Sequence, residues 1–374
     1  MTHKLGVGVI GCGIISSAYM QLAPNFGGIE IRACADAKPG AAETRAEEFG
    51  LRAQSVDDLL ASDEIDIVVN LTVPNAHFEV SKAALEAGKH VFSEKPFVLS
   101  LADGRKLAEI ATAKGLRVGS APDTFLGGAH QLARYLVDNG AVGKITSGTC
   151  FVQSAGMEMW HPNPDFFFQP GGGPILDLGP YCVSNLVQLL GPVKKVVAMS
   201  ASASEYRTIT SKPRFGEKIK VETPTTIHAV LHFASGALVT YCASWDVWQH
   251  GHSNMELYGT NGTLHVPDPN FFGGEVRMTE GASFVNRLPA WDHALGRFND
   301  SGRANYRTVG LADMAQAILE NRPHRCSMEL SLHIVDVLTA ILSSAESGSF
   351  KELTTTCERP APLTIDDATR LLAA

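Results

Sequence analysis

The stretch Leu5-Gly-Val-Gly-Val-Ile-Gly-Cys-Gly-Ile-Ile-Ser16 decides the fold of this chain. A short apolar run ends in closely spaced glycines, and a helical pattern begins directly after them. Gly11 permits the tight turn, Gly13 allows close approach to the backbone, and Ser16 is small enough for helix–strand packing. The N–H groups and dipole of the following helix favour an anion at this turn. The stretch therefore predicts the pyrophosphate-binding turn of a dinucleotide-binding Rossmann domain.

Asp36 follows the second predicted strand, 29–35, and lies twenty residues beyond Ser16. A carboxylate at this place accepts hydrogen bonds from the adenosine ribose and repels a 2′-phosphate, which favours NAD. The nearby Lys38 leaves NADP open, because a cation tolerates that phosphate. The alternative is a turn that serves packing alone, with Asp36 as a solvated acid. The residues predicted here to contact the dinucleotide are Gly11, Gly13, Ile14, Ile15 and Asp36.

Strands and helices alternate through the first third of the chain. Further strands are predicted at 65–72, 91–93 and 116–119, with helices at 14–22, 40–49, 76–87 and 101–114. Parallel strands joined by crossover helices form a doubly wound sheet covered on both faces. Residues 1–124 are therefore predicted to form an α/β Rossmann domain.

The pattern changes after residue 124. Strands follow one another with few helices between them, at 145–153, 193–203, 219–233, 237–245 and 255–258. Helices are predicted at 129–139, 176–190, 309–320 and 330–345. Residues 125–374 are therefore predicted to form an α+β substrate domain with a large, mainly antiparallel open sheet. Its uncovered face is expected to join subunits into a homodimer or homotetramer.

Composition limits the class of partner. The 374 residues are 45% apolar and 19% charged, with a net charge of −8, which offers no basic surface to nucleic acid or an anionic membrane. No uninterrupted apolar run approaches the roughly 20 residues that span a bilayer. Seven scattered cysteines without a C-x-x-C pair, and no signal-peptide pattern after Met1, favour a reduced, cytoplasmic protein. A small molecule is the expected partner.

Three further motifs follow predicted strands or open a helix. They are Thr72-Val-Pro-Asn-Ala-His77, Ser93-Glu-Lys-Pro96 and Gly171-Gly-Gly-Pro-Ile-Leu-Asp-Leu-Gly-Pro-Tyr181. Together with the glycine turn, and in order and spacing over essentially the whole chain, they resemble the Gfo/Idh/MocA oxidoreductase family. The resemblance implies a nicotinamide-dependent enzyme with a Rossmann domain and a sheet-based second domain.

The resemblance also assigns residues. It implies that Thr72, Pro74, Asn75 and His77 border the ribose and nicotinamide, and that Glu94 and Lys95 lie beside the nicotinamide ribose. It implies catalytic roles for Lys95, Asp177 and Tyr181. Many relatives carry histidine where Tyr181 stands, so the proton acceptor stays open between Tyr181 and Lys95.

Simple chemistry supports these assignments without settling them. A positive charge on oxidised nicotinamide lowers the pKa of a neighbouring lysine, which helps Lys95 polarise a hydroxyl. Asp177 and Tyr181 are four residues apart and share one helix face. The alternatives are a surface lysine for Lys95 and a packed core tyrosine for Tyr181.

Weaker signals complete the predicted site. Trp160 and His161 lie in a proline-rich loop, where an indole beside hydrogen-bonding groups suits a sugar ring; an ordinary packed loop is the alternative. The full set predicted to bind substrate is Lys95, Asp123, Trp160, His161, Asp177 and Tyr181. The histidine pairs His228/His232 and His250/His252 lack an acid or cysteine cluster, so no metal is predicted.

The expected reaction is reversible hydride transfer between a secondary hydroxyl of a sugar, glycoside or cyclitol and nicotinamide C4. NAD is the expected cofactor, with NADP not excluded. One alternative is an NAD-dependent glycosidase that oxidises the sugar only transiently. Another is a non-catalytic NAD-binding sensor, which is expected to lack Lys95 or Asp177.

Overall fold

A computed structural model describes residues 4–284, 288–300 and 302–373. The chain divides into two compact units, each made of segments that are not contiguous in sequence. Unit 1 comprises Met1–Gly128, Asp292–Val335 and Pro360–Ala374, and unit 2 comprises Ala129–Trp291 and Asp336–Arg359. Two late segments thus pack with the N-terminal unit, whereas the sequence analysis placed everything after residue 124 in the second domain.

Unit 1 is built on a six-stranded sheet in which all neighbouring strands are parallel. In spatial order the strands are β3 (Arg52–Ala53), β2 (Ile29–Ala35), β1 (Leu5–Ile10), β4 (Ile67–Asn70), β5 (His90–Ser93) and β6 (Val118–Ser120). The strand order reverses between β1 and β4, which is where such sheets bind ligands. The predicted Rossmann fold is confirmed.

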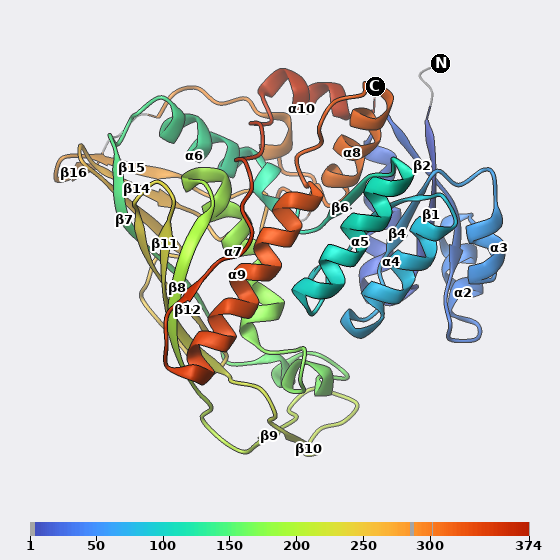
Figure 1. The fold of residues 1–374 in the computed structure, drawn as a ribbon, viewed down its shortest axis with the longest axis horizontal. Helices are drawn as coiled ribbons and strands as arrows, with labels where there is room; N and C mark the ends of the chain where they lie inside the picture. Colours follow the sequence, from blue (N-terminus) through green and yellow to red (C-terminus); the bar gives the residue numbers. More distant parts are fainter. Residues whose placement is uncertain (1–3, 285–287, 301, 374) are drawn as a thin grey trace. The chain divides into compact units, whose positions relative to one another are not determined.

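Helices cover this sheet (Figure 1); those between its strands are α1 (Ile14–Leu22), α2 (Ala41–Phe49), α3 (Val56–Ala61), α4 (His77–Glu86) and α5 (Leu101–Lys114). Ser100 caps α5 because its hydroxyl accepts the Asp103 N–H at 3.1 Å, and Gly115 ends the helix in the left-handed conformation. Fully buried Val68 and Val91 pack in one cluster with Leu107. The apolar periodicity in the sequence therefore becomes the core of unit 1.

Asp123 joins the first segment of unit 1 to its second segment, Asp292–Val335. The Asp123 carboxylate accepts the backbone N–H groups of Thr308 and Gly310, both at 3.0 Å. These residues start α8 (Val309–Leu319), so the carboxylate satisfies helix N–H groups that otherwise lack partners. No local sequence pattern announces this cap, because about 185 residues separate its partners.

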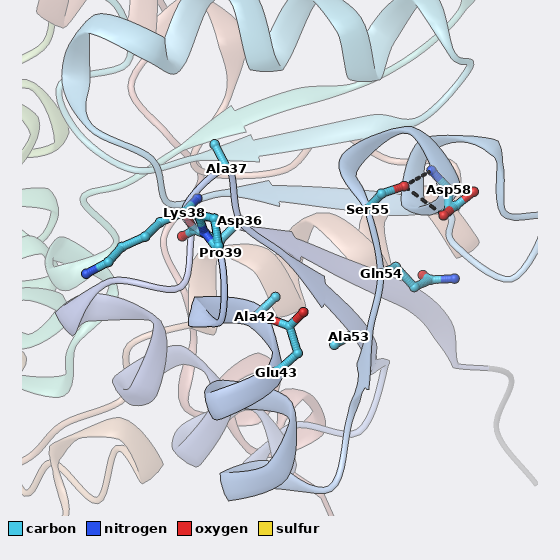
Figure 2. A pocket seen from close by; sticks show the side chains of 10 residues that line it. All are labelled: Asp36, Ala37, Lys38, Pro39, Ala42, Glu43, Ala53, Gln54, Ser55 and Asp58. Atoms are coloured by element: carbon cyan, nitrogen blue, oxygen red, sulfur yellow. Dashed lines mark hydrogen bonds between the residues drawn. The ribbon is translucent and has the colours of Figure 1, made fainter.

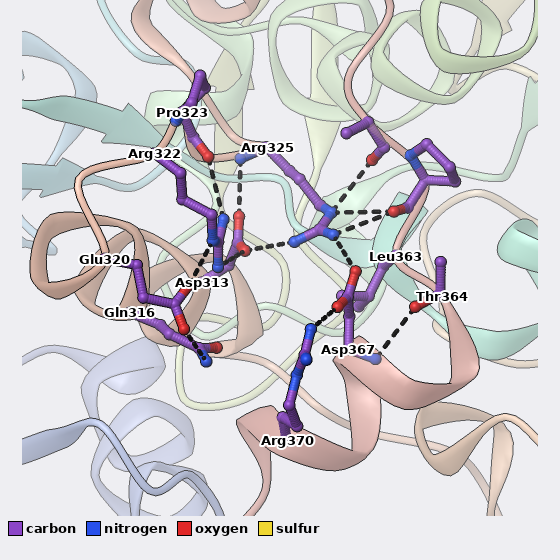
Figure 3. Close-up of polar contacts among 12 residues, drawn as sticks. Asp313, Gln316, Glu320, Arg322, Pro323, Arg325, Leu363, Thr364, Asp367 and Arg370 are labelled. Atoms are coloured by element: carbon purple, nitrogen blue, oxygen red, sulfur yellow. Dashed lines mark hydrogen bonds and ion pairs between the residues drawn. The ribbon is translucent and has the colours of Figure 1, made fainter. Parts of the chain in front are cut away.

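An ion-pair network ties the end of the chain to α8 (Figure 3). Arg325 lies 2.5 Å from Asp313 on α8 and 2.8 Å from Asp367 on α10 (Ile365–Leu371). Arg325 and Asp313 are both buried, and Asp313 also lies 3.1 Å from Arg322, so each buried charge has two partners within the network. The network explains why the C-terminal segment belongs to the N-terminal unit.

Unit 2 is built on a nine-stranded sheet that is antiparallel except between β7 and β12. In spatial order the strands are β16 (Ser283–Phe284), β15 (Arg277–Glu280), β14 (Thr263–Val266), β13 (Met255–Gly259), β7 (Ile145–Gln153), β12 (Leu238–Ser244), β11 (Thr226–Phe233), β8 (Val193–Ala201) and β17 (Lys351–Glu352). The predicted mainly antiparallel open sheet is confirmed.

The remaining elements of unit 2 are α6 (Gly128–Asp138), α7 (Pro174–Leu190), part of α9 (Met328–Ser347), and the strands β9 (Tyr206–Thr208) and β10 (Lys218–Lys220). Helix α7 packs on the large sheet, while β9 and β10 form a separate two-stranded sheet (Figure 1). Among the described helices, α9 is the one long and apolar enough to cross a membrane by length and composition, and 67% of its apolar window is buried in the fold. All seven cysteines are free thiols and buried.

Candidate active site

The glycine turn has two glycines that are needed for different reasons. Gly11 has φ +104°, and an added Cβ would lie 2.5 Å from the Leu71 carbonyl carbon, so the fold itself requires glycine there. Gly13 has φ −72° and nothing within 4 Å of an added Cβ. The open space beside Gly13, at the start of α1, is what an approaching pyrophosphate needs. The turn therefore fits a dinucleotide.

Asp36 is fixed beside this turn. One carboxylate oxygen accepts the Cys12 N–H at 2.6 Å and the other accepts the Lys38 N–H at 2.7 Å. A hollow of about 590 Å³ lies next to it, and Figure 2 shows the side chains that line it. Three of them are carboxylates (Asp36, Glu43 and Asp58) and one is a cation (Lys38). The charge of this lining is unfavourable to a phosphate.

The T-V-P-N turn follows β4 and lies against the glycine turn, since Leu71 N–H donates to the Ile10 carbonyl at 2.8 Å. Asn70 is fully buried and shapes the turn: its amide donates to the His77 carbonyl, and its oxygen accepts the Thr72 hydroxyl at 2.7 Å. Thr72 and Pro74 are half-buried, and Asn75 is exposed. The predicted residues therefore stand at the carboxyl edge of the sheet.

Two apolar side chains at this edge face solvent. Ile14, at the start of α1, is 69% exposed, and Val73, in the T-V-P-N turn, is 63% exposed. Ile15 beside them is half-buried. Apolar surface at the ends of β1 and β4 is suited to the flat rings of a dinucleotide.

His77 joins two of the motifs. Its Nδ1 lies 2.7 Å from the Pro96 carbonyl oxygen and its Nε2 lies 3.0 Å from the Thr72 carbonyl oxygen. The ring is 1% exposed, and burial lowers the pKa of His77 although the two carbonyls act in the opposite direction. His77 therefore links the Thr72 turn to the turn that carries Glu94 and Lys95, and its place beside the cofactor stays a prediction.

Glu94 is buried and holds the backbone of Lys95. Its Oε2 accepts the Lys95 N–H at 2.9 Å, while its Oε1 accepts the Tyr19 hydroxyl at 2.9 Å and lies 3.2 Å from Arg307 Nη1. Burial acts to raise the pKa of Glu94, but the charges of Arg307 and Lys95 outweigh it and hold that pKa below its usual value. Glu94 is therefore ionised, and half-buried Lys95 stands beside a fixed carboxylate.

Sequence reasoning missed two residues of this group. Arg307 lies 213 residues from Glu94, just before α8, and no motif marks it. Tyr19 reads as an ordinary apolar position of α1. Only the folded chain brings both to Glu94.

Asp123 differs from its prediction. The carboxylate is 1% exposed and is engaged by the Thr308 and Gly310 N–H groups. Burial raises the pKa of Asp123 to about 6. Its contacts are those of a helix cap, so the structure gives a substrate contact no support.

In unit 2, the glycines before α7 allow a tight approach. Gly173 has φ +89°, and an added Cβ on Gly172 would lie 2.5 Å from the Phe166 and Phe167 carbonyl oxygens. Helix α7 begins directly after them, with Asp177 in its first turn and Tyr181 one turn later. Asp177 is half-buried and Tyr181 is 5% exposed.

Trp160 and His161 lie near the start of α7. The Trp160 side chain is 63% exposed, and its ring meets that of His161 edge to face at 5.4 Å. The Asn163 N–H donates to His161 Nδ1 at 3.1 Å, so a neutral ring carries its proton on Nε2. Burial lowers the pKa of His161, and the Asp177 carboxylate acts in the opposite direction. Trp160 and His161 are therefore in ring contact, and the charge of Asp177 acts on His161 within unit 2.

Across residues 4–284, 288–300 and 302–373, no group of three or more His, Cys, Asp or Glu side chains is arranged to hold a metal ion.

Comparison with known proteins shows the family of the chain. Residues 5–121 match the family described as "Oxidoreductase family, NAD-binding Rossmann fold", and residues 130–265 match the "GFO/IDH/MocA C-terminal domain". A dTDP-3,4-didehydro-2,6-dideoxy-alpha-D-glucose 3-reductase of Saccharopolyspora spinosa is 30% identical over 255 residues, which is 66% of this chain and 73% of that protein. The chain belongs to the GFO/IDH/MocA oxidoreductase family. The resemblance seen in the motifs and the NAD-binding Rossmann domain are thus confirmed.

Other GFO/IDH/MocA proteins are similar over different lengths. A levoglucosan dehydrogenase of Pseudarthrobacter phenanthrenivorans is 26% identical over 291 residues, covering 70% of this chain and 73% of that one. The solved structure of a levoglucosan dehydrogenase with NADH and L-sorbose superposes with a TM-score of 0.80 at 22% identity, covering 94% and 99% of the chains. The chain spans 35% to 73% of the length of these and other curated relatives.

Proposed function

We propose that the protein is an NAD-dependent dehydrogenase that oxidises a secondary hydroxyl of a sugar, glycoside or cyclitol in the cytoplasm. The observation that carries the proposal is Lys95 at the carboxyl edge of an NAD-binding sheet, its backbone held by the buried, ionised Glu94. Two relatives support the substrate class, since one is named as a reductase of a dTDP-linked sugar and another as levoglucosan dehydrogenase.

NAD is favoured over NADP by the charges around Asp36. The Asp36 carboxylate would accept hydrogen bonds from the ribose hydroxyls, and the Cys12 and Lys38 N–H groups already orient its two oxygens. A 2′-phosphate would enter a hollow that Glu43 and Asp58 also line. Repulsion between these carboxylates and a 2′-phosphate would disfavour NADP.

When bound, the nicotinamide accepts or donates a hydride at its C4. Lys95 Nζ would stabilise the developing alkoxide by its charge, and a positioned cation of this kind is effective because it needs no reorganisation. Asp177 would accept a hydrogen bond from a neighbouring substrate hydroxyl. The substrate proton would pass either to Lys95 Nζ as a neutral amine, which gains its positive charge in that step, or to Tyr181 as a phenolate, with Lys95 already charged beside it.

Unit 2 would supply the surface for the sugar. Exposed Trp160 offers a flat apolar face, and His161 offers an Nε2–H donor within the electrostatic influence of the Asp177 carboxylate. An apolar face edged by donors and acceptors suits a ring whose two faces carry C–H groups and whose rim carries hydroxyls.

An absorbance screen at the NADH band tests the proposal. NAD and NADP would be offered in parallel with aldoses, glycosides, inositols and sugar lactones. We expect NADH to accumulate in step with oxidation of a sugar or cyclitol, with NAD preferred. Cleavage of a glycoside without net NADH, or no turnover of any polyol, would contradict the proposal.

The open sheet supports the proposal of a homo-oligomer. Apolar side chains lie exposed on three neighbouring strands of unit 2: Met199 (79%) on β8, Val230 (39%) on β11 and Leu238 (49%) on β12. Contiguous apolar surface of this kind is typical of subunit interfaces. Light scattering at micromolar concentration is expected to give a dimer or tetramer, and a monomer would contradict it.

A further inference from the structure

The loop that carries Trp160 and His161 is joined to a distant hairpin. We call residues 156–168 the platform loop; it connects β7 to α7. The hairpin of β9 and β10, residues 206–220, comes about 40 residues later and lies outside the large sheet. The Thr210 and Ser211 N–H groups both donate to the Glu158 carbonyl, at 3.0 and 3.2 Å. The hairpin thus bonds to the backbone of the loop.

One hairpin side chain acts directly on His161. The Ser211 hydroxyl donates to the His161 carbonyl at 2.6 Å, and Ser211 is 8% exposed. This bond fixes the backbone at the residue whose ring is already fixed by the Asn163 N–H. His161 is therefore held at its backbone carbonyl by Ser211 and at its ring by Asn163.

Arg207 of β9 is the main ionic link. Its Nη1 lies 3.2 Å from Glu158 of the platform loop, and its Nη2 pairs with Asp246 and donates to the Trp245 carbonyl at 3.1 Å. All three charged side chains are at most 15% exposed. The planar guanidinium reaches two carboxylates and a carbonyl at once, which a lysine cannot do.

A second arginine extends the same arrangement. Arg214, in the tip between β9 and β10, pairs with both oxygens of Asp165 in the platform loop and with Glu217 of its own hairpin. The Glu222 N–H, just beyond β10, donates to the Phe168 carbonyl at 2.8 Å. The loop is therefore held near its start, at His161 and near its end.

We propose that the β9–β10 hairpin is a brace that fixes the platform loop, and that Arg207 and Ser211 are positioning residues for the sugar substrate. A loop that populates its binding geometry only part of the time lowers apparent affinity by that fraction. The brace therefore acts on substrate affinity and leaves NAD binding, which belongs to unit 1, unchanged. This role rests on the proposed function only for the identity of the ligand.

Two variants weaken the brace and one serves as a matched control. Ser211→Ala removes the hydroxyl that holds His161, and Arg207→Lys keeps the charge but loses the fork. Lys220→Ala removes an exposed side-chain ion pair with Glu222 and leaves the backbone bond from the Glu222 N–H to the Phe168 carbonyl in place. Amide hydrogen exchange of residues 156–168 is measured for each, together with KM for the best substrate and the Kd of NADH.

The brace predicts faster exchange of the platform loop in Ser211→Ala and Arg207→Lys, but not in Lys220→Ala. It predicts a rise in KM of about three- to tenfold, the loss expected for one buried hydrogen bond, with the Kd of NADH within about twofold of the parent value. If Arg207→Lys does not fold, Ser211→Ala alone decides.

Unchanged exchange in Ser211→Ala would overturn the brace. So would faster exchange with an unchanged KM, because the loop would then not serve the substrate. If the parent enzyme oxidises no sugar or cyclitol, the proposed function fails, and the exchange rates still decide whether the hairpin fixes the loop.

Discussion

The two units hold their predicted site residues by different means. In unit 1 the glycine turn, Thr72 and Lys95 follow directly from the ends of strands, and their backbone is fixed largely by neighbouring strand ends. In unit 2 Trp160 and His161 lie on a loop that Arg207 and other hairpin residues hold from a distance. The comparison teaches that motifs identify candidate residues in both units, whereas the remote contacts that hold the loop of unit 2 cannot be read from motifs.

The largest effect on kcat is expected at Lys95, and it would assign the chemical step to unit 1. Lys95→Ala removes the charge that stabilises the alkoxide, so kcat should fall about 100- to 10,000-fold. The Kd of NADH, measured by fluorescence titration, should change little, because the phosphate turn is untouched. Normal kcat in this variant would remove Lys95 from the mechanism.

A smaller effect of a different kind is expected at Trp160. Trp160→Ala removes an exposed aromatic face from unit 2, so KM for the sugar should rise about tenfold while kcat changes less. Exposed Trp248, at 83% exposure, provides a matched control, and Trp248→Ala should leave KM near the parent value. A fall in kcat of about tenfold with no change in KM would contradict a role limited to binding.

The glycine turn allows a local comparison within unit 1. Gly13→Ala adds a methyl where the fold has room, so the melting temperature should stay near that of the parent while NADH binds about five- to tenfold more weakly. Gly11→Ala adds a methyl against the Leu71 carbonyl, so it should lower the melting temperature. Equal stability of the two variants would show that the turn is not strained at Gly11.

The smallest effect at the optimum pH, but a diagnostic one, is expected at Arg307, a distant residue that supports Lys95 through Glu94. Because Arg307 helps to keep the pKa of Glu94 low, Arg307→Met should raise that pKa and move the acid limb of kcat/KM to higher pH. The lowered pKa contributes stability that is present above the ordinary carboxyl pKa and is lost as pH falls through the folded value, so the variant should also be less stable near neutrality.

Arg307→Lys keeps the charge and serves as the control. Its pH profile should stay close to that of the parent enzyme. If the methionine and lysine variants have the same profile, the charge of Arg307 does not act on Glu94.

Much of the fold follows from short-range patterns. The apolar period of two predicts β7 at 145–153 to the residue, and the period of 3.6 places α5 at 101–114 and α8 within one residue. The short elements were harder: α3, β9 and α10 were not predicted, because three to seven residues carry too little periodicity to distinguish them from loops.

Asp123 and His77 show the limit at the site. Their positions after strands correctly predict the sheet edge, but their partners are remote or internal: Asp123 caps a helix about 185 residues away, and the buried ring of His77 lies between two carbonyl oxygens. A motif predicts the position of a residue in the fold, but it does not predict which groups its side chain will contact.

The sequence by itself determined the Rossmann turn, the acid at the end of β2, the E-K-P lysine and the helix that carries Asp177, because each depends on residues adjacent in the chain. Only the tertiary structure decided that Arg307 keeps Glu94 ionised, that the C-terminal helix α10 packs with the first unit, and that a hairpin holds His161. The reason is physical: ion pairs and buried hydrogen bonds act over a few ångströms in space, without regard to separation along the chain.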